Sequence, residues 1–476
     1  MRCVLGSFFE SKRHRFCGKA TLVPDKLFEH IEKKSDEYVQ ELKTVCTYES
    51  ISAYKESHKQ KIADCSQMLT RIMDDLGFET RVSSINGGNP IILGELKSSR
   101  SHAKTLMFYN HYDVQPAEPV SEWISEPFSL AEREGRLYAR GVSDNKGPLV
   151  ARLAAVKAVL DVFGETPTNL IFIIEGEEEI GSPSLEPFVK ANKEQLRADG
   201  CLWEGSERDA SGRIVVKLGY KGMLYVELSA KGPKTDQHSK WAPILANPAW
   251  RLCWALASMK NRDERVLIDN FYDEINEPTE GDLAELRETA FDVASLKKSF
   301  GVNRLLAEDN AQDFVKQLFF MPTLNIAGFH AGYSGPASKT ILPHQATAKV
   351  DIRLVPDQDP SKMLELLKRH LAKHGFNDIE LKSVNQMDCA RSSIESEIVK
   401  TVMKSAREVY EKDPIIYPIA NGSSPMSTII NLLGIPSAGV SGTSRNDSNV
   451  HGPNENIRRE DFIDGIKLMT RIISRF

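Results

Sequence analysis

No part of the 476-residue sequence approaches the ~20 consecutive apolar residues that a membrane-spanning helix needs, so we expect no membrane as a partner. Cysteine is also scarce: the seven cysteines are widely spaced, odd in number and without a CxxC pair. This spacing is typical of reduced intracellular thiols and excludes a zinc ribbon or a thioredoxin-type motif. The sequence therefore predicts a cytoplasmic protein.

An excess of charge of either sign is missing as well. Lys and Arg number 61 and Asp and Glu 66, for a formal net charge of -5, so nothing favours nucleic acid as a partner. Residues 1–20 are the exception, because they carry five basic side chains against one acid, Glu10. They lack the apolar core of a secretory signal, so we interpret residues 1–22 as a basic N-terminal tail.

The length of the chain exceeds what one hydrophobic core usually holds, which predicts two domains. The larger domain is expected to be α/β, with a central mixed β-sheet flanked by helices. Inside it, a β-α-β-β-α-β-like order predicts an inserted ferredoxin-like α+β domain. The expected bounds are 23–215 with 387–476 for the larger domain and 216–386 for the insert. The strands and helices predicted for the insert are 223–230, 248–259, 346–354, 361–374 and 379–384.

Acids and histidines recur where predicted elements begin or end. His111 follows the apolar run 106–108, Glu204 follows the strand 200–203, and His451 lies in a loop after the strand 435–440. Asp144 directly precedes an Ala/Leu/Val-rich helix expected over 147–162. Ends of strands are where open α/β sheets place ligand sites, and histidine and carboxylate ligands are typical of zinc. These positions indicate a divalent metal site.

The densest acidic segment follows the continuous apolar run 169–174, which is typical of a strand buried on both faces. Four carboxylates lie within residues 175–179, where they would repel one another unless a cation neutralised them. A solvated acidic turn is the simple alternative. The position at the exit of a buried strand favours the metal.

Four motifs resemble one known family. They are His111-Tyr-Asp113-Val-Gln-Pro, Gly141-Val-Ser-Asp144-Asn-Lys-Gly147, Glu175-Gly-Glu-Glu178-Glu179-Ile-Gly-Ser182 and Val450-His451-Gly-Pro-Asn-Glu455. In this order they resemble the aminoacylase/carnosinase family of dizinc metallopeptidases (peptidase family M20), and most closely its cytosolic non-specific dipeptidases. The resemblance runs from about Asp25 to the C-terminus. It implies a zinc-peptidase-like catalytic domain with an inserted lid and dimerisation domain.

The resemblance also implies a site of two zinc ions, with manganese or cobalt as other possible metals. Asp144 would bridge the two ions, His111 and Glu204 would complete one site, and Glu179 and His451 the other. At Glu204 the dipeptidase branch usually has Asp, whereas other branches have Glu. Glu178 would be the general base that activates the water shared by the metals, and Asp113 would orient the His111 ring. The peptide between Asp144 and Asn145 would be cis.

Substrate contacts follow from the same resemblance. Arg353 would pair with a substrate carboxylate, for which a guanidinium fork is suited. Thr340, Gly422 and Ser423 match substrate-binding positions, and a plain surface role is the alternative for each substrate residue named here, including Arg353 and His238. His238 matches a histidine that reaches the active site of the neighbouring subunit, which implies a homodimer. Here Ser-Lys-Trp follows His238 where the family usually has Ser-Gly.

The sequence therefore predicts a metal-dependent hydrolase that cleaves the amide bond of dipeptides or short peptides with a free C-terminal carboxylate. An N-acyl or N-carbamoyl amino acid amidohydrolase is the first alternative, because it would share the metals and the fold and differ only in its acyl pocket. A catalytically silent binding homologue is the second. The complete set of expected ligands and the presence of Glu178 argue against the second alternative.

Overall fold

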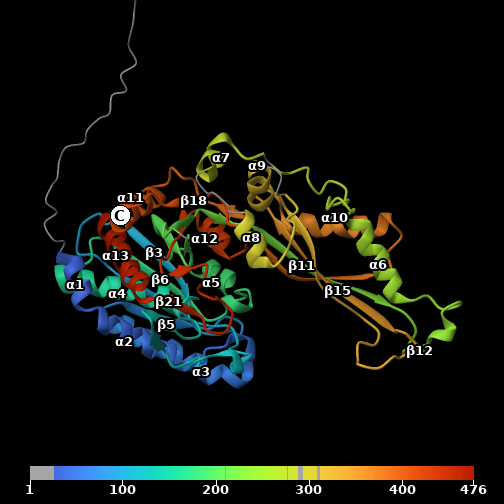
Figure 1. The fold of residues 1–476 in the computed structure, drawn as a ribbon. Helices are drawn as coiled ribbons and strands as arrows, with labels where there is room; N and C mark the ends of the chain where they lie inside the picture. Colours follow the sequence, from blue (N-terminus) through green and yellow to red (C-terminus); the bar gives the residue numbers. More distant parts are fainter. Residues whose placement is uncertain (1–25, 210, 276, 288–292, 308–310) are drawn as a thin grey trace, which may run out of the picture.

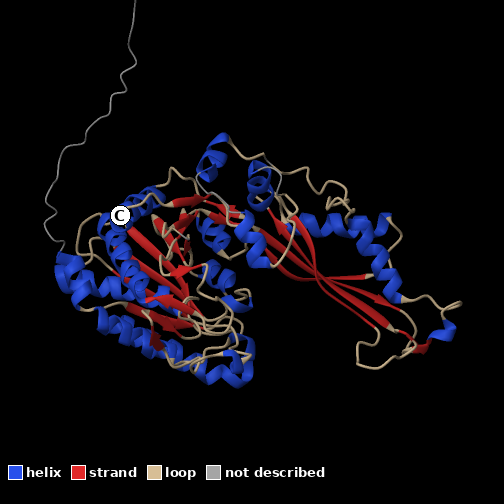
Figure 2. Cartoon of the chain, viewed as in Figure 1, coloured by secondary structure: helices blue, strands red, loops and turns tan. Residues whose placement is uncertain are grey.

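An eight-stranded mixed β-sheet forms the centre of the larger part of the chain (Figures 1 and 2). The structure is a computed structural model that describes residues 26–476 except 210, 276, 288–292 and 308–310, so the predicted basic tail lies outside the described residues. In spatial order the strands are β1 (Glu79–Ser83), β2 (Ile91–Leu96), β6 (Asn169–Glu175), β3 (Thr105–His111), β7 (Gly200–Trp203), β19 (Ser437–Gly439), β9 (Val215–Lys217) and β18 (Ile415–Tyr417).

The four central strands β6, β3, β7 and β19 run parallel. Strand β2 pairs antiparallel with β6, and β1 pairs antiparallel with β2. Strand β6 shows why the sheet is central: after Asn169 all of its residues are buried. Phe172 packs into the core on one face, whereas Ile171 and Ile173 pack into the core on the other. A strand covered on both faces needs apolar side chains in both directions, which explains its unbroken apolar sequence.

Helices cover both faces of this sheet. The larger core contains residues of α1 (Lys26–Lys33), α2 (Ser35–Cys46), α3 (Lys55–Asp75), α4 (Lys146–Phe163), α11 (Glu397–Tyr410) and α13 (Arg459–Arg475). The core of the opposite face contains residues of α5 (Leu185–Ala191) and α12 (Met426–Leu433). The parallel strands therefore lie in an interior layer, and their ends form the accessible edge.

Helix α4 carries one part of this edge, because Asp144 directly precedes its N-cap residue Asn145. The helix is rich in Ala and Leu, which favour helix formation, and its Ala, Leu and Val side chains together favour burial. It ends at Gly164, which takes the left-handed conformation (φ 76°) that glycine adopts without strain. A three-stranded sheet of β4 (Ala131–Arg133), β5 (Arg136–Tyr138) and β21 (Asn456–Arg458) brings the segments near Gly141 and Glu455 together.

The insert has its own four-stranded antiparallel sheet and its own core. Its spatial order is β13 (Thr323–Ala331), β15 (Gln345–Leu354), β11 (Gly222–Lys231) and β16 (Glu380–Met387), which is the ferredoxin-like order. Helices α6 (Pro248–Met259) and α10 (Pro360–Lys373) pack against this sheet. The two-stranded sheet of β12 (Gln237–His238) and β14 (Ile341–Leu342) lies at the end of the insert that is remote from the large sheet (Figure 1).

The remaining short elements connect these parts. They are α7 (Glu280–Arg287), α8 (Val293–Phe300), α9 (Ala311–Val315), β8 (Glu207–Arg208) with β20 (Ser444–Arg445), and β10 (Gly219–Tyr220) with β17 (Ala390–Arg391). Within the described ranges, no helix has both the length and the apolar character to cross a bilayer. The predicted fold class, an α/β unit with a mixed sheet and an inserted ferredoxin-like unit, is confirmed.

Candidate metal centre

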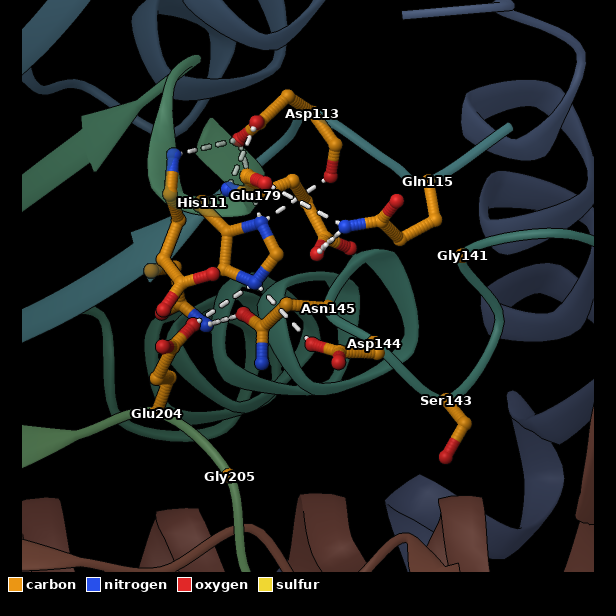
Figure 3. A network of polar contacts seen from close by, with 12 residues as sticks. His111, Asp113, Gln115, Gly141, Ser143, Asp144, Asn145, Glu179, Glu204 and Gly205 are labelled. Carbon is orange, nitrogen blue, oxygen red and sulfur yellow. Dashed lines mark hydrogen bonds and ion pairs between the residues drawn. The ribbon is translucent and has the colours of Figure 1, made fainter. Parts of the chain in front are cut away.

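The predicted ligands gather at one edge of the large sheet. Strands β3, β6 and β7 are parallel, so their C-terminal ends lie at the same edge. His111 ends β3 opposite Glu175, the last residue of β6, and Glu204 follows directly after β7. Asp144 reaches the same edge from the start of α4 (Figure 3). Four separate segments thus place histidine and carboxylate side chains at the same edge of the sheet.

Asp144 stands between two histidines, one for each of its carboxylate oxygens. Its Oδ1 is 3.1 Å from His111 Nε2, and its Oδ2 is 3.2 Å from His451 Nε2. His111 Nε2 is also 3.0 Å from Glu204 Oε2, and His451 Nε2 is 3.2 Å from Glu179 Oε2. The potential ligand atoms therefore form two groups that share Asp144.

Both groups suit a divalent cation. Imidazole nitrogen and carboxylate oxygen are normal zinc ligands, and the ligand atoms around a tetrahedral zinc lie about 3.3 Å apart at bond lengths of about 2.0 Å. The donor separations here, 3.0–3.2 Å, are close to that spacing. Glu179 Oε1 is buried and has no hydrogen-bond partner among the described residues. Such an atom is stabilised by a cation, because a buried carboxylate oxygen without a partner is costly.

Neighbouring polar groups fix the orientation of the potential ligands. His111 Nδ1 is 3.0 Å from the main-chain oxygen of Asp113 and 3.3 Å from its carboxylate, so the ring can donate from Nδ1 and keep Nε2 free. The Asp113 carboxylate also accepts hydrogen bonds from the main-chain N–H groups of Glu178 and Glu179. Gln115 Nε2 donates to Glu179 Oε2 at 2.9 Å (Figure 3). Asp113 therefore connects the histidine strand to the acidic loop.

Glu455 is a residue to which sequence reasoning assigned no role, although it ends one of the four motifs. Its buried carboxylate accepts hydrogen bonds from the main-chain N–H groups of Gly141, Ser143 and Asp144 and from Arg140 Nη1. Arg140 Nη2 in turn donates to the main-chain oxygen of His451. This network holds the Asp144 loop against the His451 loop. The peptide that follows Asp144 is cis, as the resemblance implied.

The electrostatics of the cluster favour positive charge at its centre. Hydrogen bonds to Asp144 and Glu179 raise the pKa of His451 to about 10. Burial opposes protonation of His111, yet the nearby Glu204, Asp113 and Asp144 carboxylates outweigh it and raise its pKa well above the usual value. Burial raises the pKa of Asp144, but hydrogen bonds with both histidines reverse this and lower it. Without a metal, protons on the histidines supply the charge that a cation would otherwise supply.

Metal binding is therefore expected to release protons. A cation needs the unprotonated imidazole nitrogen, so cations must displace the protons that the raised pKa values favour on both histidines. His451 retains its proton up to a pH near 10. The same shift means that protonated His451 stabilises the metal-free protein fully below pH ~6.5, and this stabilisation is lost as the pH rises through about 10. We expect about one proton released per cation at pH 7, and tighter apparent binding as the pH rises from 6 to 9.

Calorimetric titration of metal-free protein with Zn²⁺, in buffers of different ionisation enthalpy, measures this release. His451→Gln should release about one proton fewer, because its side chain carries no titratable proton. Zn²⁺ binding with no net proton release in any buffer would contradict the protonated cluster.

The glutamate expected to act as base lies beside the two groups. Glu178 opens a 3₁₀ turn, Glu178–Ile180, that also carries Glu179. Burial and then the charge of Glu204 raise the pKa of Glu178 well above its usual value, although His111 opposes this rise. A carboxylate that gains a proton this readily is suited to proton transfer once cations balance the surrounding charge.

The expected substrate residues fall into two further places. Ser423 Oγ donates to the main-chain oxygen of Gly222, the first residue of β11, and Gly422 accepts from the main-chain N–H of Lys221. Arg353 lies opposite Met223, the next residue of β11, and is about one-third exposed. Arg353, Gly422 and Ser423 therefore meet where the insert joins the large sheet.

His238 and Thr340 lie together elsewhere, at the remote end of the insert. His238 pairs with Ile341 between β12 and β14, and the main-chain oxygen of Thr340 accepts from the N–H of Ser239. Both residues are exposed. Within one chain the β12–β14 sheet that carries them lies at the end of the insert remote from the large sheet (Figure 1).

The chain matches the model of peptidase family M20/M25/M40 over residues 107–475. It therefore belongs to this family of peptidases, and its metallopeptidase members imply a divalent metal at the paired groups. The family assignment made from the four motifs is confirmed.

Among individual proteins, the chain is 30% identical to the Beta-Ala-His dipeptidase of Rattus norvegicus, over 93% of this chain and 94% of the relative. It is 28% identical to the Cys-Gly metallodipeptidase dug1 of Schizosaccharomyces pombe, over 93% and 96%. Among solved structures, it is similar to the M20 family metallo-carboxypeptidase Sso-CP2 of Sulfolobus solfataricus, with 40% identity, a TM-score of 0.87 and coverage of 92% and 99%. All three are peptidases, and the names of the last two describe metal-dependent enzymes.

Proposed function

We propose that the protein is a dizinc hydrolase that cleaves the amide bond of dipeptides or short peptides with a free C-terminal carboxylate. The observation that carries this proposal is Asp144, which offers one carboxylate oxygen to each of two histidine–carboxylate groups. His111 with Glu204 would hold one cation, and Glu179 with His451 the other. The names of the relatives, which include dipeptidases and a carboxypeptidase, agree with this reaction class.

The chemistry that divalent cations would supply when bound here is polarisation of a scissile carbonyl and a lower pKa for the attacking water. Glu178 would take the proton of this water at its carboxylate and later deliver it to the leaving amine. Asp113 supports both adjacent glutamates, because its carboxylate accepts from the N–H groups of Glu178 and Glu179. Two neighbours on one short turn can thus serve different roles, one in proton transfer and one as a ligand.

Recognition of the substrate carboxylate is assigned to Arg353, with Gly422 and Ser423 beside it at the base of the insert. A partly exposed guanidinium at this junction can meet a ligand held between the insert and the sheet edge. We further propose that residues 23–215 and 387–476 form the catalytic domain and residues 216–386 a lid and dimerisation domain. The separate cores of the two sheets support this division.

A homodimer formed through the insert is part of the proposal. Strand β13 is an edge strand that pairs only with β15 in the described sheet, and Ile326 and Phe329 on it are exposed. Trp250 and Trp254 on α6 are also exposed and stack on each other at 6.0 Å between ring centroids. Exposed apolar side chains at an unpaired strand are typical of a protein interface.

A cytoplasmic location fits the free cysteines among the described residues, which are Cys46, Cys65, Cys201, Cys253 and Cys389.

A hydrolysis screen with zinc-, manganese- or cobalt-loaded protein tests the reaction class. The panel contains dipeptides, tripeptides, their C-terminal amides, and N-acetyl and N-carbamoyl amino acids. We expect the free dipeptides or short peptides to be the best substrates. Preference for the N-acyl or N-carbamoyl compounds would identify an amidohydrolase instead, and complete inactivity with both cations bound would favour a silent binding homologue.

Arg353→Ala is expected to lower kcat/KM for a dipeptide by about 30-fold or more, because losing one desolvated charge pair costs about 2–5 kcal/mol. The C-terminal amide of the same dipeptide should lose far less, since it carries no carboxylate for the guanidinium. Lys349→Ala is the matched control, because Lys349 is an exposed cation on the same strand and face. Equal losses on the acid and the amide would contradict the role of Arg353.

A further inference from the structure

Arg152 is a fully buried cation on α4, about two helical turns beyond Asp144. Its hydrogen bonds to the described residues go to neutral oxygens and not to a carboxylate. The acceptors are the main-chain oxygens of Tyr109 (2.6 Å), Leu202 (3.3 Å), Trp203 (2.6 Å) and Val440 (3.0 Å) and the side-chain oxygen of Asn110 (2.7 Å). A buried guanidinium without an acid partner is rare enough to need an explanation.

These acceptors lie at the C-terminal ends of three neighbouring parallel strands. Tyr109 and Asn110 immediately precede His111 in β3, and Leu202 and Trp203 immediately precede Glu204 at the end of β7. Val440 directly follows β19. The group of potential ligands formed by His111, Asp144 and Glu204 is called the first group below. One guanidinium therefore connects the strand ends that carry two of its three members, His111 and Glu204.

The third potential ligand of this group, Asp144, is connected by a different route. The side-chain N–H of Asn110 donates to the Asn145 side-chain oxygen, while Asn110 Oδ1 accepts from Arg152. Asn145 follows Asp144 and occupies the N-cap position of α4, the helix on which Arg152 lies. The helix and the strand ends are thus linked both through Asn110 and through Arg152 itself.

The chemistry of the guanidinium suits this position. Its planar fork presents several N–H donors in fixed directions, whereas a lysine would present one compact ammonium group. Carbonyl oxygens at the ends of neighbouring strands converge there in the interior, where oxygens without a partner are costly. Burial lowers the pKa of Arg152 to about 10, so the group stays charged at neutral pH. Its charge and geometry can therefore hold the strand ends together at neutral pH.

We propose that Arg152 is a positioning residue that sets the spacing of His111, Asp144 and Glu204, and with it the affinity of this group for its cation. The proposal rests on the function proposed above, because it assumes that these residues bind a cation. The second group depends on it less, because Glu179 and His451 come from loops that Arg152 does not contact. Loss of Arg152 should therefore weaken one cation site selectively.

Variants that keep only one complete group of ligands allow the cation affinity of each group to be measured separately. Glu179→Gln leaves the group with Glu204 as the only complete group, and Glu204→Gln leaves the group with Glu179. Arg152→Lys and Arg152→Met are introduced into each background, and Zn²⁺ affinity is measured by competition with a chelating indicator. In the Glu179→Gln background we expect affinity to fall by about 10-fold or more, as is typical when groups that orient a ligand are lost. In the Glu204→Gln background, whose group shares only Asp144 with the contacts of Arg152, affinity should fall far less.

Leu69→Ala is the control for loss of stability, because Leu69 is buried in the core on α3 and belongs to none of these contacts. It should lower the thermal midpoint without changing the ratio of the two affinities. If Arg152→Met does not fold, Arg152→Lys decides the question, since lysine keeps the charge and loses the fork. Equal losses in both backgrounds, or no loss in either, would overturn the proposal.

The affinity measurement does not depend on catalysis. A wild-type protein that binds two cations but hydrolyses no peptide would refute the proposed function and leave the role of Arg152 to be judged from the affinities. A wild-type protein that hydrolyses dipeptides, with Arg152 variants that lose no selectivity between the sites, would refute only the role of Arg152.

Discussion

Glu178→Gln is expected to lower kcat by about 10³-fold, within the range of about 10²- to 10⁴-fold that a positioned general base supplies. The substitution keeps the shape of the side chain and removes its ability to take a proton. The metal groups do not include Glu178, so metal analysis should still find both cations. Steady-state kinetics and metal content, measured on the same preparation, test this separation.

Glu179→Gln provides the comparison on the adjacent residue. Glu179 Oε2 contacts His451 and accepts from Gln115, and its other oxygen has no hydrogen-bond partner among the described residues. Losing this charge should deplete one cation and lower activity as a consequence. Full metal content in Glu179→Gln together with depletion in Glu178→Gln would reverse the two assignments.

The gathering of the site at one edge could be predicted because it follows from a simple rule of sheet geometry. Apolar runs end before His111, Glu175 and Glu204, and parallel strands place their C-terminal ends at one edge. The fourth segment of the site, which carries Asp144, could be predicted in the same way because Asp144 lies just before an Ala-rich helix. Local sequence patterns were sufficient there because each side chain is placed by the element next to it.

Contacts between remote segments could not be predicted on the same basis. Glu455 binds main-chain N–H groups more than 300 residues earlier, and no local pattern indicates which loop a buried carboxylate will meet. Arg152 had a weak signal, because it is a charged residue inside an Ala/Leu/Val-rich helix that is otherwise expected to be buried. The pattern marks the residue as unusual, but its acceptors depend on how three strands lie beside the helix.

In the proposed homodimer, the placement of His238 would have a catalytic consequence. The β12–β14 sheet that carries it lies at the end of the insert remote from the large sheet of the same chain (Figure 1). The main-chain N–H of Lys240 donates to His238 Nδ1, so the neutral ring carries its proton on Nε2. A neutral histidine with an exposed Nε2–H can donate to the oxygen that becomes negative in the transition state. We expect His238 to act in the active site of the partner subunit.

His238→Ala should lower kcat by about 10²- to 10³-fold, the usual effect of removing one such donor. Mixing His238→Ala with Glu178→Ala protein and allowing subunits to exchange should then restore activity. In a mixed dimer one site combines an intact Glu178 with an intact His238, and the other site lacks both. Random exchange makes about half of the dimers mixed, so about a quarter of all sites should recover.

A reciprocal mixture distinguishes action across the dimer from simple stabilisation by mixing. When wild-type protein exchanges with the double variant His238→Ala/Glu178→Ala, every mixed dimer has one site without the base and one without the histidine. Only wild-type homodimers remain active, so activity should fall to about half of its value before exchange. If His238 acted within its own chain, the first mixture would stay inactive and the second would keep its activity. These opposite outcomes, with exchange verified by mass-labelled subunits, decide whether each active site is built from two chains.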